Sequence, residues 1–466
     1  MQRLQQFRCP FINFRMKNLL IAALIIFWFT KLPAQEDSSC LCTSVLSEIV
    51  HDIETSYPGF PSKTSSNPKA YLIHKQLLVS KAANISDREN CFYLLEKYLS
   101  YFGDNHLLLS DRTTKPKPHL LNGQTAQKAS NGQSGIEGTW RRDSDGFSVA
   151  IRRIQKNTYR AFVMDSANEQ TRISSSYFDL LGDREQFRIR RYDSFLTTDL
   201  MRGRVMGNTL IEPGGTWTRT VKGKPFQRPA NYTGAWNKNF SHHKLGPGTY
   251  YMAIPEFSMD PLKFDSIVVN DIIPAMSAGR TRHLILDLRN NFGGNSSFLS
   301  LIRLVYQKPI ALAGDYVYST PKMIARYTRS KNPLHQKMLP GLVAGPGKFV
   351  QRDSTRYILK ESLTYPQQVS IIVNDNCASS TEYLLVIARL SSKVKIYGRP
   401  TAGTLDYSEL LGPEPLSCKG YSFMVPTTKS FWTDHRPIDK TGIIPDVDLS
   451  QYPENQWVQI VKAQKL

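Results

Sequence analysis

The segment NDNCASSTE at residues 374–382 places two serines at a turn between two regular elements. The apolar run before it predicts a buried strand at 368–373, and the residues from Ser379 or Ser380 to Leu390 predict a helix. A serine at such a turn lies at the carboxyl edge of the sheet, where the first backbone N–H groups of the helix have no helical partner. Those groups would stabilise an oxyanion, so the pattern fits a nucleophilic serine. The alternative is a serine that only caps the helix.

A second turn, NNFGG at residues 290–294, follows a strand predicted at 283–288. Consecutive glycines let the backbone approach another group closely, so the N–H of Gly293 or Gly294 is a candidate for a second oxyanion donor. The alternative is a tight turn that merely requires glycine conformations. The run is too short and wrongly spaced for a dinucleotide or nucleotide phosphate loop.

Four segments in one order carry a family resemblance: LILDLRNNFGG from residue 284, VSIIVNDNCASSTE from 369, YGRPTAGTLDYSE from 397 and TGIIPDVDL from 441. Over residues 250–450 the chain resembles the tail-specific, or C-terminal-processing, protease family. That resemblance implies a layered α/β spiral of crotonase-like character with a serine nucleophile. It assigns the nucleophile to Ser379, and the oxyanion hole to the N–H groups of Ser380 and of Gly293 or Gly294.

The family's main branch takes a lysine base from a T-x-G-K pattern, where this chain has TAGT and therefore Thr404. A second branch, which the chain also resembles, comprises the tricorn-type proteases and uses a histidine from a G-x-x-H pattern far upstream. The sequence GDNH, ending at His106, matches that pattern. The resemblance implies His106 as general base, with Asn105 and Asp439 as orienting or polarising partners. The family's usual PDZ signature is missing, and a β-rich segment stands in its place.

Two other interpretations stay open. The motifs SNPK at 66–69, SKN at 330–332 and KTG at 440–442 follow the order seen in penicillin-binding enzymes and β-lactamases, although a proline interrupts the first. A degenerate protease-like fold that binds peptides or other ligands is the second alternative, which Thr404 and Asp439 make credible. Hydrogen-bond reach between the histidine and the serine would favour catalysis over binding.

Composition and periodicity predict the elements that must position these residues. A chain of 466 residues, 41% hydrophobic and 21% charged, predicts about three globular domains. The expected fold is multidomain α+β. Its predicted parts are a helical domain at 36–110, a Pro- and Gly-rich linker at 111–134, a β-sandwich or barrel at 135–235 and the α/β protease domain at 236–466.

The clearest helix of the first predicted domain precedes the candidate histidine. Ser86 and Glu89 form a capping-box pattern, apolar residues follow at helical spacing, and Gly103 marks the end.

Residues 1–35 predict a secretory signal peptide, because basic residues precede an apolar run of 11 residues at 19–29. That run is shorter than the roughly 20 residues that span a bilayer. We therefore expect export to the periplasm or the extracellular space. The alternative is that the N-terminal segment stays uncleaved as an anchor, and this is the only membrane contact that we expect. Five cysteines would remain, and an odd count leaves at least one thiol free.

The formal net charge is +20, from 59 Lys and Arg against 39 Asp and Glu, which permits an anionic partner without selecting one. No zinc-finger spacing or RNA-binding aromatic signature occurs, so no nucleic-acid partner is expected. No zinc-protease histidine spacing occurs either, and no metal or other cofactor is expected. The sequence thus predicts a serine peptidase that hydrolyses peptide or protein substrates through an acyl-enzyme, with its oligomeric state left open.

Overall fold

The structure is a computed structural model that describes residues 40–120, 136–143, 145–165, 173–183, 186–198, 202–212, 215–220, 239–439 and 441–464. The predicted signal peptide and the larger part of the predicted linker lie outside these residues. Within these ranges, no helix has the length and apolar character needed to cross a membrane.

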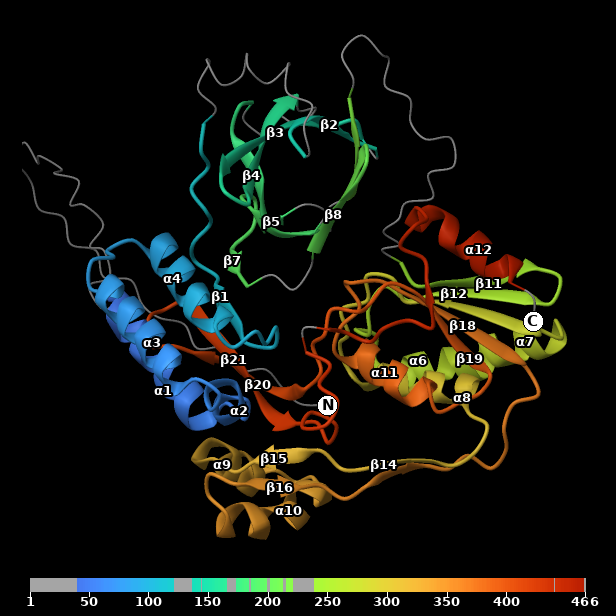
Figure 1. The fold of residues 1–466 in the computed structure, drawn as a ribbon. Helices are drawn as coiled ribbons and strands as arrows, with labels where there is room; N and C mark the ends of the chain where they lie inside the picture. The colour runs from blue at the N-terminus through green and yellow to red at the C-terminus, as the bar shows by residue number, and fades with distance from the viewer. Residues whose placement is uncertain are drawn as a thin grey trace, which may run out of the picture. The chain divides into compact units, whose positions relative to one another are not determined.

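Helices come first along the described chain (Figure 1): α1 (Cys42–Ser56), α2 (Phe60–Thr64), α3 (Pro68–Ala82) and α4 (Arg88–Ser100). The N-cap of α4 is Asp87, whose carboxylate accepts the N–H of Asn90 at 2.9 Å. The predicted cap at Ser86 is therefore wrong by one residue, because aspartate caps a helix as well as serine does. Gly103, with φ 56°, lies just beyond the end of the helix.

The buried faces of these helices pack against strands from the far end of the chain. Leu46 of α1 and Leu95 of α4 share one apolar cluster with Phe423. Phe423 lies in a sheet with the order β16-β15-β21-β1-β7, to which β20 adds on β21. Its strands are β1 (Leu108–Asp111), β7 (Leu196–Thr197), β15 (Tyr316–Tyr318), β16 (Phe349–Gln351), β20 (Tyr407–Pro415) and β21 (Tyr421–Lys429). The loop between α4 and β1 is thereby fixed against the C-terminal part of the fold.

Disulfides strengthen this attachment. Cys40 is bonded to Cys418, 378 residues away in sequence, and Cys42 is bonded to Cys91. A cross-link over so long a loop removes much conformational freedom from the unfolded chain. Among the cysteines that the structure describes, Cys377 is free and buried, in agreement with the odd count.

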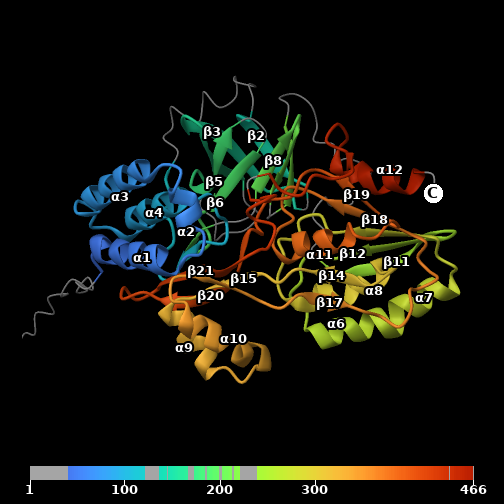
Figure 2. The same ribbon diagram turned by 60° about the horizontal axis from the view of Figure 1, so that its bottom comes forward.

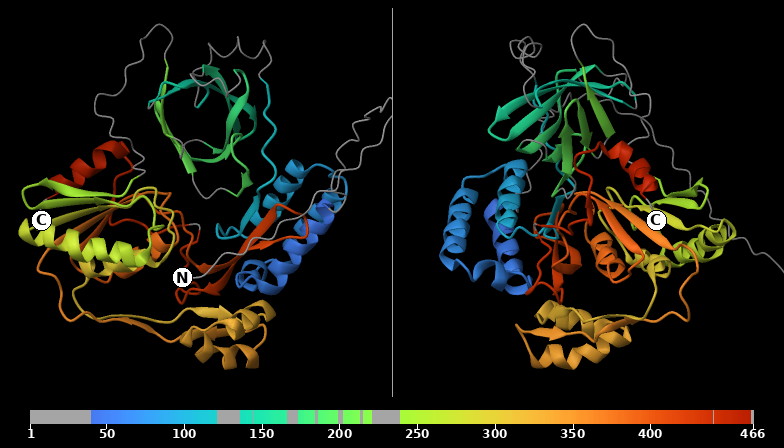
Figure 3. Two further views of the ribbon diagram at one scale, coloured as in Figure 1. Left: turned by 180° about the vertical axis from the view of Figure 1, so that it is seen from behind. Right: turned by 45° about the vertical axis from the view of Figure 1, so that its right-hand side comes forward.

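The β-rich prediction is confirmed in its barrel form. The strands close in the order β10-β2-β3-β4-β5-β6-β8-β9, and Figure 3 shows the ring. Large apolar side chains, among them Trp140, Phe178, Phe187 and Trp217, pack together inside it. The strands are β2 (Gly138–Arg142), β3 (Ser148–Gln155), β4 (Thr158–Asp165), β5 (Ser176–Asp183), β6 (Gln186–Arg191), β8 (Arg202–Met206), β9 (Thr209–Glu212) and β10 (Gly215–Arg219).

A second sheet, with the order β11-β12-β13-β18-β19-β22, carries the two turns singled out above. All neighbours from β12 onward are parallel, and β11 is an antiparallel edge. The predicted strands at 283–288 and 368–373 pair directly, so both turns leave the same sheet edge. The strands are β11 (Ser241–Gly246), β12 (Thr249–Ala253), β13 (His283–Asp287), β18 (Gln368–Val373), β19 (Val394–Gly398) and β22 (Val447–Asp448).

Helices cover both faces of that sheet (Figure 2). On one face of the sheet, apolar side chains form a cluster with residues of the helical segments packed there. On the opposite face, another apolar cluster includes Trp457 and Val461 of α12. The helical segments are α6 (Pro261–Ile267), η1 (Val268–Ile272), α7 (Ile273–Ala278), η2 (Ser296–Leu301), α8 (Ile302–Val305), α11 (Ser380–Ala388), η3 (Glu454–Gln456) and α12 (Trp457–Ala463).

An excursion between α8 and β18 completes the fold. It leaves along β14 (Ile310–Leu312), which pairs with β17 (Thr355–Tyr357), and it contains α9 (Pro321–Arg329) and α10 (Pro333–Ala344). Strand β15 of this excursion pairs with β21, so the excursion is joined to the sheet on which the N-terminal helices pack.

Candidate active site

Ser379 occupies the sharp turn between β18 and α11, where it is the N-cap residue. Its φ of 55° and ψ of −119° are unusual for a residue with a side chain and cost on the order of 1–3 kcal/mol. Its N–H faces the Glu382 carboxylate and the Thr404 carbonyl, each at 3.1 Å, and these contacts stabilise the turn. A strained turn from strand to helix exposes a serine hydroxyl at the sheet edge.

His106 reaches this serine from the loop between α4 and β1. Its Nε2 lies 3.1 Å from Ser379 Oγ, and its Nδ1 lies 2.6 Å from the main-chain oxygen of Tyr407. A carbonyl oxygen only accepts, so Nδ1 carries the proton and Nε2 is left to accept from the serine hydroxyl. The structure thus brings together the two residues predicted as nucleophile and base, which are 273 residues apart.

Buried polar groups hold the histidine loop. The N–H of His106 donates to Asp104 Oδ1 at 2.8 Å, and Tyr57 OH donates to Asp104 Oδ2 at 2.7 Å. Burial, and next the charge of Asp439, raise the pKa of Asp104. Roles for Asp104, Tyr57 and Tyr407 were not predicted from the sequence. Only Asp104 had a local signal, since an aspartate two residues before a histidine can form a turn with its backbone N–H.

Neither proposed partner of the histidine is hydrogen-bonded to its ring in the described structure. Asn105 Nδ2 donates to Thr404 Oγ1 at 3.1 Å. Asp439 Oδ1 accepts the N–H groups of Leu405 at 3.2 Å and Asp406 at 3.1 Å, and its Oδ2 pairs with a lysine. Asp439 therefore orders the backbone just before the Tyr407 carbonyl, and its charge reaches His106 through space.

The position of the family's lysine is filled by a different arrangement. The TAGT loop wraps around the buried Glu382, which accepts the N–H groups of Gly403 and Thr404 at 2.8 Å and the hydroxyl of Thr401. Burial raises the pKa of Glu382 to about 7, although these donors oppose the shift. Thr404 brings no amine to the serine, and the histidine supplies the basic nitrogen there.

The glycine turn lies directly against the serine turn. A Cβ on Gly293 would come within 2.8 Å of Ser379 Cβ and 2.9 Å of the Ser380 nitrogen, so only glycine fits. The N–H of Gly293 donates to Asn291 Oδ1 at 2.9 Å, which removes it from the predicted donor set. In the described structure no hydrogen bond occupies the N–H of Gly294 or Ser380. Ser380 Oγ donates to the Gly294 carbonyl at 2.8 Å and ties the two turns together.

A cavity of about 530 Å³ opens beside the histidine and the serine. Its other walls come from the glycine turn, from the start of α11, from both sides of the excursion and from β20. They include Gly294, Phe298, Asp315, Arg352, Asp353, Tyr383, Leu405 and Glu409.

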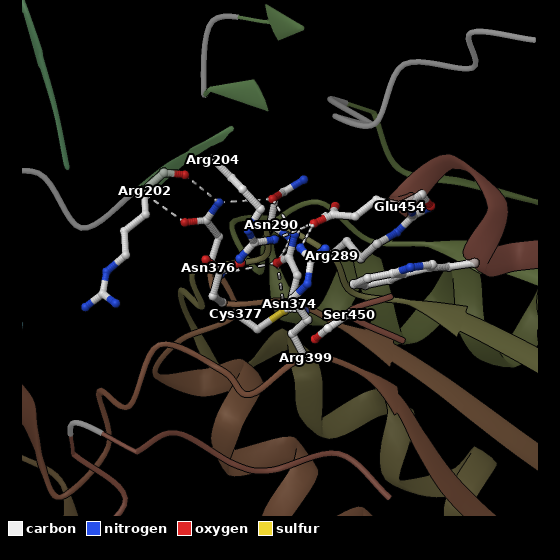
Figure 4. A network of polar contacts seen from close by, with 12 residues as sticks. Arg202, Arg204, Arg289, Asn290, Asn374, Asn376, Cys377, Arg399, Ser450 and Glu454 are labelled. Carbon is white, nitrogen blue, oxygen red and sulfur yellow. Dashed lines mark hydrogen bonds and ion pairs between the residues drawn. The ribbon is translucent and has the colours of Figure 1, made fainter. Parts of the chain in front are cut away.

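A buried network joins the barrel to the turn that precedes the serine (Figure 4). Arg204 of β8 pairs with Asp375 and donates from Nη1 to Glu454 Oε1 at 2.8 Å. Glu454 also accepts from Arg399 at 2.9 Å and from Asn374 at 3.3 Å. The site is therefore supported from the barrel side as well as from the protease sheet.

The main chain of the same strand adds two more contacts. The N–H of Arg202 donates to Asn376 Oδ1 at 2.8 Å, and Asn376 Nδ2 donates to the Arg202 carbonyl at 3.1 Å. Cys377, next in sequence, donates from Sγ to the Leu288 carbonyl at 2.9 Å, and burial raises the pKa of its thiol. It serves the turn as a packed residue and not as a second nucleophile.

Comparison with known proteins finds a match to one family over part of the chain. Residues 249–449 match Peptidase family S41. None of the curated proteins matches the chain. The crystal structure of mature CPAF is similar at 12% identity with a TM-score of 0.53, over 91% of this chain and 96% of that one. The structure of mature CPAF complexed with lactacystin is similar at 12% identity with a TM-score of 0.52, over 91% of this chain and 98% of that one. At this identity the likeness shows a shared fold. Residues 249–449, less than half of the 466-residue chain, are thus similar to the S41 peptidases, and this match supports a serine-type peptidase.

Proposed function

We propose that the protein hydrolyses peptide bonds through an acyl-enzyme, with Ser379 as nucleophile and His106 as general base. The observation that carries this proposal is the 3.1 Å contact between Nε2 and Oγ, on an imidazole whose Nδ1 is bonded to a main-chain carbonyl. That bond fixes the tautomer in which Nε2 can accept a proton.

The first half of the reaction follows from this geometry. As Ser379 Oγ forms its bond to the scissile carbonyl carbon, its proton passes to His106 Nε2. The N–H groups of Gly294 and Ser380 are the proposed donors to the oxyanion, since Gly293 already bonds to Asn291. Collapse of the tetrahedral intermediate breaks the C–N bond, and the imidazolium gives its proton to the leaving amine.

The second half hydrolyses the ester. A water molecule attacks the acyl carbon while His106 accepts its proton, and the returning proton releases Ser379. The lowered pKa of the buried histidine suits this role, because the neutral ring is the acceptor in both halves.

Covalent labelling tests the proposed nucleophile. A fluorophosphonate probe is expected to modify wild-type protein at Ser379, with the adduct assigned by peptide mass spectrometry, and not to modify folded Ser379→Ala. The Ser380→Ala variant is the matched control, because it tests whether the labelled serine is the neighbouring Ser380 instead of Ser379. If folded wild-type protein stays unlabelled, the alternative of a peptide- or ligand-binding module becomes the leading one.

The pH profile tests the proposed base. Burial lowers the pKa of His106 below 6.5, although the Tyr407 carbonyl and the Asp439 charge oppose this shift. The base works only when neutral, so labelling and kcat/KM should be full at pH 7 and fall on acidification, with a midpoint below pH 6.5. The measurement is the rate of labelling at constant ionic strength from pH 4.5 to 8. A midpoint above 7 would contradict the assignment.

We also propose that the mature chain is exported and that the protease domain has the crotonase-like spiral. The disulfides support export, because such bonds form and persist in oxidising compartments. The five-stranded parallel run from β12 to β22, with helices on both faces, supports the spiral.

A further inference from the structure

The cavity beside the serine has an acidic lining in a basic protein. Its walls hold the carboxylates of Asp315, Asp353 and Glu409 and the guanidinium of Arg352, while the whole chain carries a net charge of +20. Charges of one sign in a cleft attract ligands of the other sign. The question is which carboxylate remains available to a ligand.

Two of the three carboxylates already have cationic partners. Arg352 donates from both terminal nitrogens to the carboxylate of Glu409, and also to Tyr327 OH at 3.1 Å. Asp353 pairs with Lys337, and about two thirds of each side chain is exposed. Glu409 is therefore neutralised, and Asp353 belongs to the solvated rim.

Asp315 is the carboxylate without such a partner in the part of the chain that the structure describes. Its Oδ1 accepts the N–H of Phe431 at 3.2 Å, and the nearby Arg352 acts on it only through space. Burial raises the pKa of Asp315 to about 6, with these two groups opposing, so the carboxylate is mostly ionised at neutral pH. A half-buried charge of this kind gains from a cationic ligand.

The walls near Asp315 suit a long aliphatic side chain with a charged end. Phe298 and Tyr383 line the cavity with their ring centroids 5.8 Å apart, and Tyr383 packs on Trp432 at 6.0 Å. Lysine and arginine place their methylene stems on such apolar surfaces and keep the charged group at a polar site. Asp315 and Tyr383 both line this cavity.

We propose that Asp315 determines specificity, selecting substrates with a lysine or arginine side chain next to the scissile bond. This inference rests on the proposed function of Ser379. It adds a substrate class, basic peptides, to a site whose catalytic groups do not themselves select a side chain.

Quenched fluorescent peptides that differ at one position test this specificity. The position carries arginine, citrulline, leucine or glutamate, and mass spectrometry locates the cleaved bond. Citrulline matches arginine in shape and lacks its charge. We expect wild-type kcat/KM to favour arginine over citrulline by about 10- to 50-fold, with cleavage adjacent to that residue. Equal cleavage of the two peptides, or preference for leucine or glutamate, would overturn the inference.

Variants assign the preference to one carboxylate. Asp315→Asn is expected to bring the arginine-to-citrulline ratio close to one, whereas Asp315→Glu keeps it above one. A ratio cancels any loss common to both peptides, so it separates charge recognition from a general structural effect. Loss of the ratio in Asp353→Asn but not in Asp315→Asn would overturn the assignment.

Fluorophosphonate labelling in the same preparations keeps the two proposals separate. Labelled wild-type protein without an arginine preference rejects the specificity inference and leaves the nucleophile in place. Unlabelled wild-type protein rejects the proposed function itself, and with it the role of Asp315.

Discussion

Replacing His106 with alanine is expected to lower kcat/KM by about 10³- to 10⁴-fold, because it removes the proposed proton acceptor of Ser379. No other basic nitrogen is bonded to the serine hydroxyl in the described structure, and Thr404 offers none. The residual rate should come from the oxyanion donors and substrate binding alone. Steady-state kinetics on a fluorogenic peptide, with folding checked by circular dichroism, measures the loss.

Three comparisons make that result specific. His435→Ala removes an exposed histidine of the 431–439 loop and should leave kcat/KM unchanged. Added imidazole should restore part of the activity of His106→Ala, which a merely structural loss would not allow. Ser379→Ala and the double variant should be equally inactive, because residues that act as a unit are not additive. A loss below tenfold in His106→Ala would reject its role as base.

The proposed nucleophile has a local sequence signal, and the proposed base was assigned through the family resemblance. Ser379 lies in a turn framed by an apolar strand and a helix, and His106 ends the GDNH pattern that carries the resemblance. What orients the imidazole was not predictable. The acceptor is the main-chain oxygen of Tyr407, an atom that every residue has, so no residue type marks it.

The assigned partners illustrate the same limit. The resemblance placed Asn105 and Asp439 near the histidine, but it could not specify which atoms they bond. Asp439 binds backbone N–H groups in the segment leading to Tyr407, so its effect on the ring passes through the chain and through space. Asn105 bonds instead to Thr404, the residue in the place of the family's lysine.

Periodicity predicted the secondary structure well, but it did not predict which distant parts of the chain pack into one apolar core. The helices at 42–100 were expected as a domain, yet Leu46 and Leu95 are buried in one cluster with Phe423, which lies more than 300 residues further on. Helical spacing shows which face is apolar and not what covers it. The barrel was easier to predict, because apolar and polar residues alternate along its strands and the strands pair mainly with their neighbours in sequence.

No role for individual barrel residues was predictable from the sequence, but the contacts of the barrel indicate one. Arg204 and Glu454 are both buried, and neither lines the cavity beside Ser379. Through Asp375 and Asn374 they brace the turn four and five residues before the nucleophile. A strained turn persists only where its surroundings fix it firmly. The barrel thus supplies part of the support for the serine's conformation.

Arg204→Met is therefore expected to lower kcat by about 100-fold with little change in KM, because Asp375 would be left buried without its cation. Removing one partner of a buried pair costs about 3–5 kcal/mol, and here that cost falls on the turn before the nucleophile. Glu454 keeps Arg399, so the defect is centred on Asp375. The measurements are kcat and KM on one peptide, together with the rate of fluorophosphonate labelling.

Arg202→Met is the matched control from the same strand. Arg202 contacts Asn376 through its main-chain N–H and C=O, and Figure 4 shows its side chain pointing away from the network. That variant should retain kcat, whereas Arg204→Met with Asp375→Asn should recover much of it, since the unpaired charge is gone. Equal kcat in the two single variants would mean that Asp375 holds its place without Arg204. Recovery of kcat in the double variant would instead show that the unpaired Asp375 carboxylate causes the loss. The barrel would then contribute to the activity of the peptidase site.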